Sequence, residues 1–324
     1  MGWTEGSRAL KSETSSESLL VSHPLIVIGI PCFNEADWLG RTIESVKAQT
    51  HCKFSVLIAD NASTDSTGTI ARTIAEADSR FRYHRHTENL GAASNFNFVL
   101  DRTESPFFLW LGAHDLLDPR FLEKHLEALG RDPLATVSQS THAWIDEHDR
   151  PVERVRDGPL EGGKPDSVRR YLASVRANRH NIGINSVLRR SALTGACFTT
   201  IIGTDRIILS RLAYRGPFND IDEVLYQRRT FRSERGGWGG YMERLTGRFN
   251  SGPAENWKGM ADAYDEDLSE LTRGQAMQPL YRALLQIILR YYLPVDRNSL
   301  LTSFLWTVRR STKLIVSIGR RSPR

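Results

Sequence analysis

The stretch PLIVIGIPCFN, residues 24–34, is a short apolar run that gives way to polar side chains. It is rich in β-branched residues and has Pro31 near its end. An apolar run of this length, without a polar residue at alternate positions, is typical of a strand buried on both faces of a sheet. We therefore expect a buried strand here, followed by a polar loop.

Segments of the same kind alternate with amphipathic segments further along the chain. Buried strands are predicted at 54–60 and 106–111, and a strand nearer the sheet edge at 80–86. Apolar residues at helical spacing predict helices over 37–49, 64–77, 91–102 and 119–129. This order predicts an α/β fold, with a mostly parallel central sheet and helices on both faces.

Polar loops follow the carboxyl ends of these strands. They read CFNEA, DNASTD, ENLGAASN and GAHDLLD in chain order. In open α/β sheets, ligands bind beyond the carboxyl ends of the strands. A single polar loop would be weak evidence, but loops of this kind that converge on one rim predict a binding site there.

The rim offers side-chain hydrogen-bonding groups, because neither a Walker loop nor a GxGxxG pattern follows the first strand. Asn34, Glu35, Asp60, Asn61 and Ser63 occupy the predicted rim. A carboxylate at a strand end can accept a hydrogen bond from a base N–H or a ribose hydroxyl. From the residues alone, Asp60-Asn61 fits equally well an Asx turn that ends the strand.

The remainder of the chain has a less regular pattern. The predictions there are a strand at 134–145, a loop at 149–166, a helix at 167–177, a strand turning into a helix at 181–193, a helix at 203–216 and a strand at 218–229. Beyond about residue 240 the pattern becomes helical, aromatic and basic.

Composition is that of an ordinary globular protein, with 40% hydrophobic and 25% charged residues among 324. The net charge of +5 is diffuse, which does not favour a nucleic-acid partner. Three cysteines, Cys32, Cys52 and Cys197, form no disulfide or zinc pattern, which favours a reducing compartment. We therefore expect a cytoplasmic protein.

Residues 1–22 are rich in Ser and Glu and lack the apolar core of a signal peptide, so we expect a disordered leader. No run of about 18 uncharged apolar residues occurs, so no membrane span is predicted.

Three segments together resemble the family-2 glycosyltransferases. IPCFNEADWLGRTIESVKAQT (30–50) is similar to the opening of that family, and IADNASTDSTGTI (58–70) to its Asp-[Asn/Asp]-x-Ser-x-Asp-x-Thr segment. ENLGAASNFNFVL (88–100) resembles its Asn-x-Gly-x-x-x-Asn segment. With GTDRIILSRLAYRGPFNDIDEVLYQRR (203–229), the resemblance reaches about residue 230.

The resemblance implies a GT-A nucleotide-diphospho-sugar transferase sandwich with a helical C-terminal extension. It implies an inverting glycosyltransferase of the hexosyltransferase type, which acts in polysaccharide or glycoconjugate biosynthesis. The donor would be a UDP-, dTDP- or GDP-linked sugar. The acceptor would be a hydroxyl of a saccharide, a lipid-linked glycan or a natural product.

The domain boundaries follow from the same resemblance. The catalytic domain would span 23–235, with a donor half at 23–130 and an acceptor half at 131–235. A helical, basic region would follow at 236–324.

The resemblance also assigns donor-binding roles at the rim. Asp60 would face the base, with Asn61 near the nucleoside. The remaining rim residues would line the donor pocket or approach the ribose and diphosphate: Pro31, Asn34, Glu35, Asn89 and Gly91.

The stretch GAHDLLD departs from the family at its Asp-x-Asp signature, where a divalent cation bridges carboxylate and diphosphate. Asp115 matches the last Asp, Ala113 replaces the first, and His114 lies between them. A downstream histidine that many relatives carry is absent from YQRRTFRSERGG (226–237). Mn²⁺ or Mg²⁺ is therefore expected, although two ligand positions are missing.

Several alternatives stay open for this loop. Asp115 could hold Mg²⁺ or Mn²⁺ almost alone, or His114 could add a nitrogen ligand, which suits Mn²⁺ better. Arg228, Arg229 or Arg232 could instead neutralise the diphosphate, and Arg229 is the expected donor contact. The plain structural alternative is that His114 and Asp115 only cap the next helix.

Inversion requires a base beside the acceptor hydroxyl. The family places an Asp at a helix start, and Asp205 matches it. The helix N-terminus would favour the ionised form of Asp205. The alternative is that Thr204 or Asp205 is merely an N-cap, and Asp222 and Glu223 are fallback bases.

Residues 281–324 combine apolar runs with Arg and Lys, and no acidic residue follows Asp296. This pattern fits peripheral contact with the inner face of an anionic membrane, or a helix that packs on the catalytic domain with a disordered basic end. A second function class also stays open, in which the protein binds the donor but has lost catalysis or performs it without metal.

Overall fold

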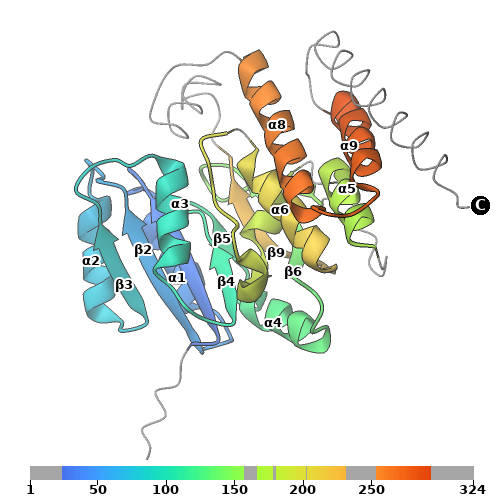
Figure 1. Ribbon diagram of the computed structural model, residues 1–324. Helices are drawn as coiled ribbons and strands as arrows, with labels where there is room; N and C mark the ends of the chain where they lie inside the picture. Colours follow the sequence, from blue (N-terminus) through green and yellow to red (C-terminus); the bar gives the residue numbers. More distant parts are fainter. Residues whose placement is uncertain (1–23, 157–165, 178–179, 202, 231–252, 293–324) are drawn as a thin grey trace, which may run out of the picture.

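The computed structural model describes residues 24–156, 166–177, 180–201, 203–230 and 253–292 (Figure 1). The expected leader at 1–22 and the basic end of the chain lie outside the described residues.

The strands of the described residues form one nine-stranded sheet, in the order β3-β2-β1-β4-β8-β6-β9-β5, with β7 paired to β6. Their bounds are β1 Ile26–Cys32, β2 Phe54–Asp60, β3 Phe81–Arg85, β4 Phe107–Trp110, β5 Leu116–Leu117, β6 Val137–Ile145, β7 Pro151–Val155, β8 Val187–Arg189 and β9 Phe218–Arg229. The first four strands run parallel, with β1 between β2 and β4 and β3 at the edge. This confirms the predicted order and the edge position of the third strand.

The second half of the sheet is mixed, in contrast to the parallel first half. β8 runs antiparallel to both β4 and β6, whereas β9 runs parallel to β6 and pairs antiparallel with β5. The expected loop at 149–166 contains β7, which pairs antiparallel with the end of β6. The predicted strand-to-helix segment at 181–193 consists of two short 3₁₀ helices, η1 Ile182–Asn185 and η2 Arg190–Leu193, around β8.

Helices cover both faces of the sheet, as predicted (Figure 1). The helices of the first half are α1 Leu39–Lys47, α2 Thr67–Ala77, α3 Ala92–Asp101 and α4 Phe121–Arg131. Alternate residues of β1 point to opposite faces, so Ile28 packs with α1 and α4, and Val27 packs with α3. A Cβ atom at Gly29 would lie within 2.8 Å of Val99 and Phe108, so only glycine allows α3 to approach this closely.

A helical layer packs beyond the second half of the sheet (Figure 1). It contains α5 Ser167–Ala177, α6 Thr204–Arg215, α8 Pro253–Leu271 and α9 Gln278–Tyr292. Tyr171, Tyr264 and Leu285 lie in its apolar core. Arg211 of α6 pairs with Asp267 and Glu270 of α8, at 2.6 Å and 2.7 Å. Among the described helices, none has the length and apolar character needed to cross a membrane.

Two fully buried histidines lie between α4 and the sheet. His125 Nδ1 shares a hydrogen bond of 2.8 Å with Ser138 Oγ, and the His142 ring stacks on Tyr226 at 4.5 Å. Neither ring nitrogen of His142 has a hydrogen-bond partner among the described residues. Burial lowers the pKa of His125 to about 3 and lowers the pKa of His142 well below its usual value. Both rings are therefore neutral in the folded protein at neutral pH.

We predict that acid destabilises the fold through these rings. Below about pH 6.5 the unfolded chain binds protons that the folded chain excludes, so the unfolding free energy falls by up to about 1.4 kcal/mol per pH unit for each histidine. The substitution His142→Phe keeps the ring stack and removes one titrating group, so the fall between about pH 6.5 and pH 5 should become shallower. Urea unfolding at several pH values measures this.

The variant His148→Gln provides the comparison, because it removes a histidine that is exposed instead of buried. A His142→Phe variant whose stability falls as steeply as that of the wild type would contradict the assignment.

Candidate active site

The loops after β1 and β2 are held side by side by the segment at 63–67. The backbone N–H groups of Asn34, Glu35 and Ala36 each donate a hydrogen bond to a side-chain oxygen of the second loop. The acceptors are Ser63 Oγ at 2.9 Å, Thr67 Oγ1 at 2.8 Å and Asp65 Oδ2 at 3.1 Å. Thr64 N donates to Asn34 Oδ1 at 2.8 Å. The Ser-x-Asp-x-Thr spacing thus joins the two loops after β1 and β2, and Pro31 lies buried in β1 beneath them.

Asp60 is fully buried at the end of β2. Its Oδ1 accepts a hydrogen bond from Ser63 N at 2.8 Å, and its Oδ2 accepts from Tyr83 Oη at 3.0 Å and Arg85 at 2.6 Å. Register explains the Arg85 contact, because Asp60 and Arg85 are partners across β2 and β3. The carboxylate therefore orders the rim, and its direct contact with a base stays a prediction.

Asn61 connects the end of β2 to the start of α3. Its Nδ2 donates to Asn89 Oδ1 at 2.7 Å, and its Oδ1 accepts from Leu90 N at 2.9 Å. Asn89 Oδ1 also accepts from Gly91 N at 2.9 Å. Gly91 has a left-handed backbone (φ 81°) and immediately precedes α3. The structure thus brings three of the predicted donor residues together at one helix N-terminus.

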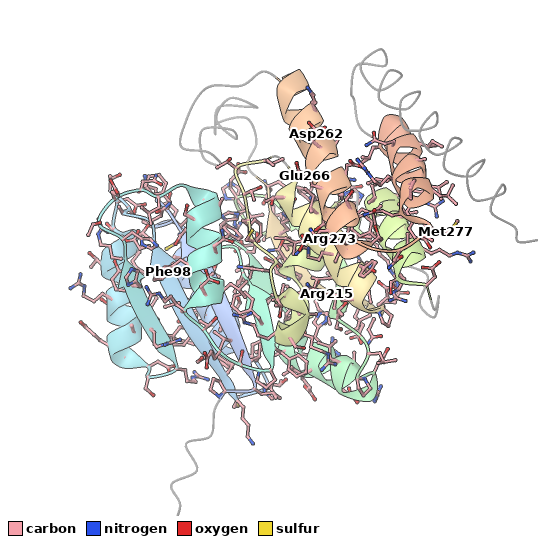
Figure 2. The ribbon with its side chains drawn as sticks, in the orientation of Figure 1. Phe98, Arg215, Asp262, Glu266, Arg273 and Met277 are labelled. Carbon is pink, nitrogen blue, oxygen red and sulfur yellow. The ribbon has the colours of Figure 1, made fainter. Side chains whose placement is uncertain are left out.

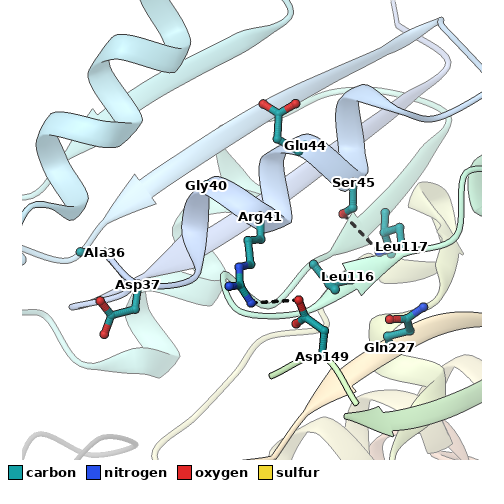
Figure 3. Close-up of a pocket in the computed structure, with 10 residues that line it drawn as sticks. All are labelled: Ala36, Asp37, Gly40, Arg41, Glu44, Ser45, Leu116, Leu117, Asp149 and Gln227. Atoms are coloured by element: carbon teal, nitrogen blue, oxygen red, sulfur yellow. Dashed lines mark hydrogen bonds and ion pairs between the residues drawn. The ribbon is translucent and has the colours of Figure 1, made fainter. Parts of the chain in front are cut away.

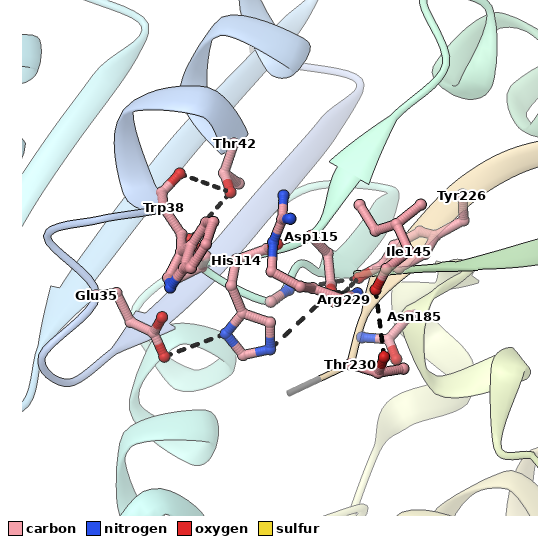
Figure 4. Close-up of polar contacts among 12 residues, drawn as sticks. Glu35, Trp38, Thr42, His114, Asp115, Ile145, Asn185, Tyr226, Arg229 and Thr230 are labelled. Atoms are coloured by element: carbon pink, nitrogen blue, oxygen red, sulfur yellow. Dashed lines mark hydrogen bonds and ion pairs between the residues drawn. The ribbon is translucent and has the colours of Figure 1, made fainter. Parts of the chain in front are cut away.

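The loop after β4 carries His114 and Asp115 (Figure 4). His114 Nδ1 lies 3.1 Å from Glu35 Oε1, and His114 Nε2 lies 3.9 Å from Asp115 Oδ1. Asp115 is almost fully buried; its Oδ2 accepts from Tyr226 Oη at 2.6 Å and its Oδ1 from Arg229 N at 2.8 Å. Burial and the neighbouring Asp115 carboxylate raise the pKa of Tyr226 well above its usual value, so its hydroxyl stays a donor.

Arg229 lies behind this loop, with its side chain fully buried. Its Nε donates to His114 O at 2.9 Å, and another guanidinium nitrogen donates to Asp146 O at 2.6 Å. The guanidinium also pairs with Asp149 and stacks on Trp38 at 4.3 Å. Arg229 lies at the predicted site, and these contacts are all with the protein, so a direct contact with the donor stays a prediction.

Arg228 differs from its neighbour because it stays partly exposed. Its guanidinium lies over the Trp144 ring at 5.5 Å and donates to His180 O at 3.2 Å. Arg232, the third arginine that could neutralise the diphosphate, lies outside the described residues.

Asp205 lies in the first turn of α6, after Gly203 at the N-cap position. The helix therefore begins at a glycine N-cap, and neither Thr204 nor Asp205 occupies that position. Asn181 Nδ2 donates to Asp205 Oδ2 at 2.9 Å, and Arg206 N donates to Asp205 Oδ1 at 2.9 Å. Asp205 keeps part of its surface open, yet its packed surroundings raise its carboxyl pKa, against the lowering effects of Arg206 and Arg228. Desolvation thus outweighs the helix N-terminus, contrary to the expectation from the sequence.

The end of β9 connects the two carboxylates. Arg229 N binds Asp115, and the adjacent Arg228 binds the backbone of His180, next to the Asn181 that holds Asp205. Asp115 and Asp205 therefore both lie near the carboxyl end of β9. The fallback residues lie elsewhere in contacts of their own, with Asp222 paired to Arg156 and Glu223 to Lys124.

The structure adds site residues that the sequence did not predict: Tyr226, Asn181, Trp38 and Asp149. Each acts through contacts between segments far apart in the chain, such as 111 residues between Tyr226 and Asp115. No local pattern signals such contacts.

A hollow of about 630 Å³ lies beside this site, between α1, β5 and Asp149 (Figure 3). Arg41 pairs with Asp149 at 2.9 Å across it. Its lining includes none of Asp60, Asp115 and Asp205, so we do not place the reaction there.

The pair His114–Asp115 has the chemistry of a shared cation site. The imidazole of His114 faces a carboxylate on each side, Glu35 at Nδ1 and Asp115 at Nε2, and a carboxylate at one ring nitrogen is common among metal-binding histidines. Each oxygen of Asp115 accepts one hydrogen bond and keeps a further lone pair. The described residues contain no cluster of three His, Cys, Asp or Glu side chains that could hold a metal ion. His114 and Asp115 are therefore too few to hold a metal ion by themselves, and a cation here would need further ligands.

Solved structures share this fold at low sequence identity. S. aureus TarS 1–349 in complex with UDP-GlcNAc matches with a TM-score of 0.63 and 14% identity over 87% of this chain and 81% of that one. The mannosyltransferase PcManGT from Pyrobaculum calidifontis, in complex with GDP-Man and Mn²⁺, matches with a TM-score of 0.54 and 15% identity over 94% and 77%. The fold is thus GT-A-like, as predicted.

Relatives by sequence cover shorter stretches. An uncharacterized glycosyltransferase of Rickettsia bellii (strain RML369-C) is 28% identical over 153 residues, which are 47% of this chain and 21% of the relative. The putative teichuronic acid biosynthesis glycosyltransferase TuaG of Bacillus subtilis (strain 168) is 33% identical over 104 residues, 32% and 41% of the two chains. The alignments thus span less than half the length of these relatives.

The family model described as "Glycosyl transferase family 2" matches residues 27–195, more than half of the chain. The match contains the hydrogen-bonded loops after β1 and β2, the Asn61–Asn89 contact and the His114–Asp115 loop. On this match, the chain belongs to glycosyltransferase family 2.

Proposed function

We propose that the protein transfers a sugar, with inversion, from a nucleoside diphosphate to an acceptor hydroxyl. The observation that carries the proposal is the convergence of Asp115 and the Asp205 segment on adjacent residues of β9. Donor residues at 23–130 and acceptor residues at 131–235 would then meet at this point. Family membership and the nucleotide sugars bound to TarS and PcManGT support a donor of the UDP-, dTDP- or GDP-sugar class.

The donor would lie along the rim. The hydrogen-bonded loops at 34–36 and 63–67 would bind the nucleoside, together with Asn61 and Asn89. The N-terminus of α3, at Gly91, would face the diphosphate, because a helix N-terminus favours negative charge. Asp60 and Arg229 would position these groups from beneath. Such a preformed rim lowers the ordering cost of binding.

The leaving group gains negative charge as its bond to the sugar breaks, and this charge must be stabilised. His114 Nε2 and one oxygen of Asp115 would hold a divalent cation jointly with the diphosphate, and such a cation would neutralise the developing charge. The nitrogen ligand favours Mn²⁺ over Mg²⁺. Arg228 stays partly exposed, whereas Arg229 is buried. Arg228 would therefore add positive charge near the reaction centre.

Asp205 would act as the base. The acceptor oxygen forms its bond to the anomeric carbon while the bond to the diphosphate breaks, and the acceptor proton passes to Asp205. Asn181 orients the carboxylate through its 2.9 Å hydrogen bond. The raised pKa of Asp205 makes it a stronger base than an ordinary aspartate. The acceptor would be a saccharide, a lipid-linked glycan or a natural product, and the location cytoplasmic.

We predict that Asp205→Asn lowers donor turnover, as transfer or hydrolysis, by at least about 100-fold while donor affinity changes by less than about threefold. In the wild type, turnover should fall as the pH falls through the raised pKa of Asp205, because the base must be ionised. Thermal shifts with UDP-, dTDP- and GDP-sugars identify the donor, and steady-state rates measure turnover.

The matched control is Asp222→Asn, an exposed fallback candidate that should keep wild-type turnover. Equal loss of donor affinity and turnover in Asp205→Asn would argue against the base role. Donor binding without turnover in the wild type would support the alternative of a binding protein that has lost catalysis.

We also predict a cation preference. Donor binding measured by calorimetry should be tighter with Mn²⁺ than with Mg²⁺, and His114→Ala should abolish most of that difference. Asp115→Ala should weaken donor binding more than His114→Ala, and Asp115→Asn, which keeps a hydrogen-bond acceptor, provides a milder second variant. Donor binding that is equal with EDTA and with either metal would refute the cation site and favour Arg228.

A further inference from the structure

Exposed apolar side chains are concentrated on one helix at the edge of the molecule. Among the described residues, eight large hydrophobic side chains are exposed, and four of these belong to α9 or the residue before it. They are Met277, Leu280, Leu284 and Ile287, with exposed fractions of 49%, 45%, 41% and 39%. The other four are distributed among separate loops and β7.

The spacing of these four residues, hereafter the α9 stripe, places them on one face of the helix. The adjacent face carries Leu285 and Leu289, which are fully buried against α5 and α8. The helix thus uses one apolar face for the core and presents a second one outward. Figure 1 shows α9 on the side of the molecule opposite β3 and α2, and Figure 2 shows Met277 at that outer side.

The charge of the chain changes sign at this helix. From residue 273 onward there are ten basic residues and one acidic residue, whereas the preceding residues contain 33 basic and 37 acidic ones. α9 itself contains arginines and no acidic residue. The acidic residues of α8 are partly neutralised, because Asp265 pairs with Arg282, and Asp267 and Glu270 pair with Arg211.

We propose that α9 docks in the plane of an anionic lipid surface. An apolar stripe on a helix with basic flanks inserts its side chains at the boundary of headgroups and acyl chains, while Lys and Arg bind the acidic headgroups. The stripe supplies the apolar part, and Arg273 and the basic residues that follow α9 in the sequence supply the charge. This inference is independent of the proposed transfer reaction.

The test is flotation of the full chain with phosphatidylcholine vesicles that contain about 30% phosphatidylglycerol. The wild type should bind these vesicles, and binding should weaken as NaCl rises from about 0.1 M to about 0.5 M. The triple variant Leu280→Gln/Leu284→Gln/Ile287→Gln should bind at least about tenfold more weakly. The variant Arg309→Gln/Arg310→Gln/Lys313→Gln should lose the preference for anionic over neutral vesicles.

The matched control is Leu134→Gln/Val152→Gln, because these side chains are the most exposed, at 76% and 57%, and lie away from α9. It should bind vesicles like the wild type. Unchanged thermal unfolding shows that each variant is folded, and a donor-induced thermal shift reports the other site separately.

Three results would overturn the proposal. The wild type could fail to bind anionic vesicles, or the α9 triple variant could bind them as well as the wild type. Light scattering could also show that the triple variant converts a dimer into a monomer, which would assign the stripe to a second copy of the chain.

Discussion

The carboxylate of Asp115 joins two parts of the chain that lie more than 100 residues apart, and the candidate site depends on this contact. It accepts hydrogen bonds from Tyr226 Oη and from Arg229 N, both on β9. A buried carboxylate without such donors would be costly, so the loop after β4 and the end of β9 are held in one arrangement. Arg229 strengthens it through His114 O and Asp149. The rim of the first half and the Asp205 segment of the second half are thereby brought to one place.

In our proposal, the same contact lets the site tolerate Ala113, which stands where the resemblance leads us to expect an aspartate. Asp115 is fixed by protein donors, and His114 is held through Glu35 at 3.1 Å, so a nitrogen and an oxygen are presented 3.9 Å apart. In our proposal, a nitrogen ligand from His114 would substitute for the missing carboxylate and would change the metal preference of the site. On the opposite side, desolvation raises the pKa of Asp205. The two aspartates thus have different environments and, in our account, different tasks.

Local patterns in the sequence predicted the amphipathic helices and the strands that are fully buried. β1 is a continuous apolar run because it lies between two parallel strands, and the loops after it are polar because they form the rim. The sequence did not predict β5, a two-residue strand whose partner β9 lies far along the chain, or β7, which falls in an expected loop. The complete burial of Asp60 was also missed, because it arises from Tyr83 and Arg85 on the neighbouring strand. Asp205 was found by family resemblance, whereas its partner Asn181 required the fold.

The most direct test of the account is a crystal structure of the protein with Mn²⁺ and a non-hydrolysable analogue of its nucleotide-sugar donor, read by anomalous scattering. We predict a manganese peak in contact with His114 Nε2, Asp115 and the diphosphate. The sugar should lie between this peak and Asp205, with Asp205 on the face of the anomeric carbon opposite the diphosphate. A nucleotide bound elsewhere, for example in the hollow between α1 and β5, or a sugar out of reach of Asp205, would contradict the account.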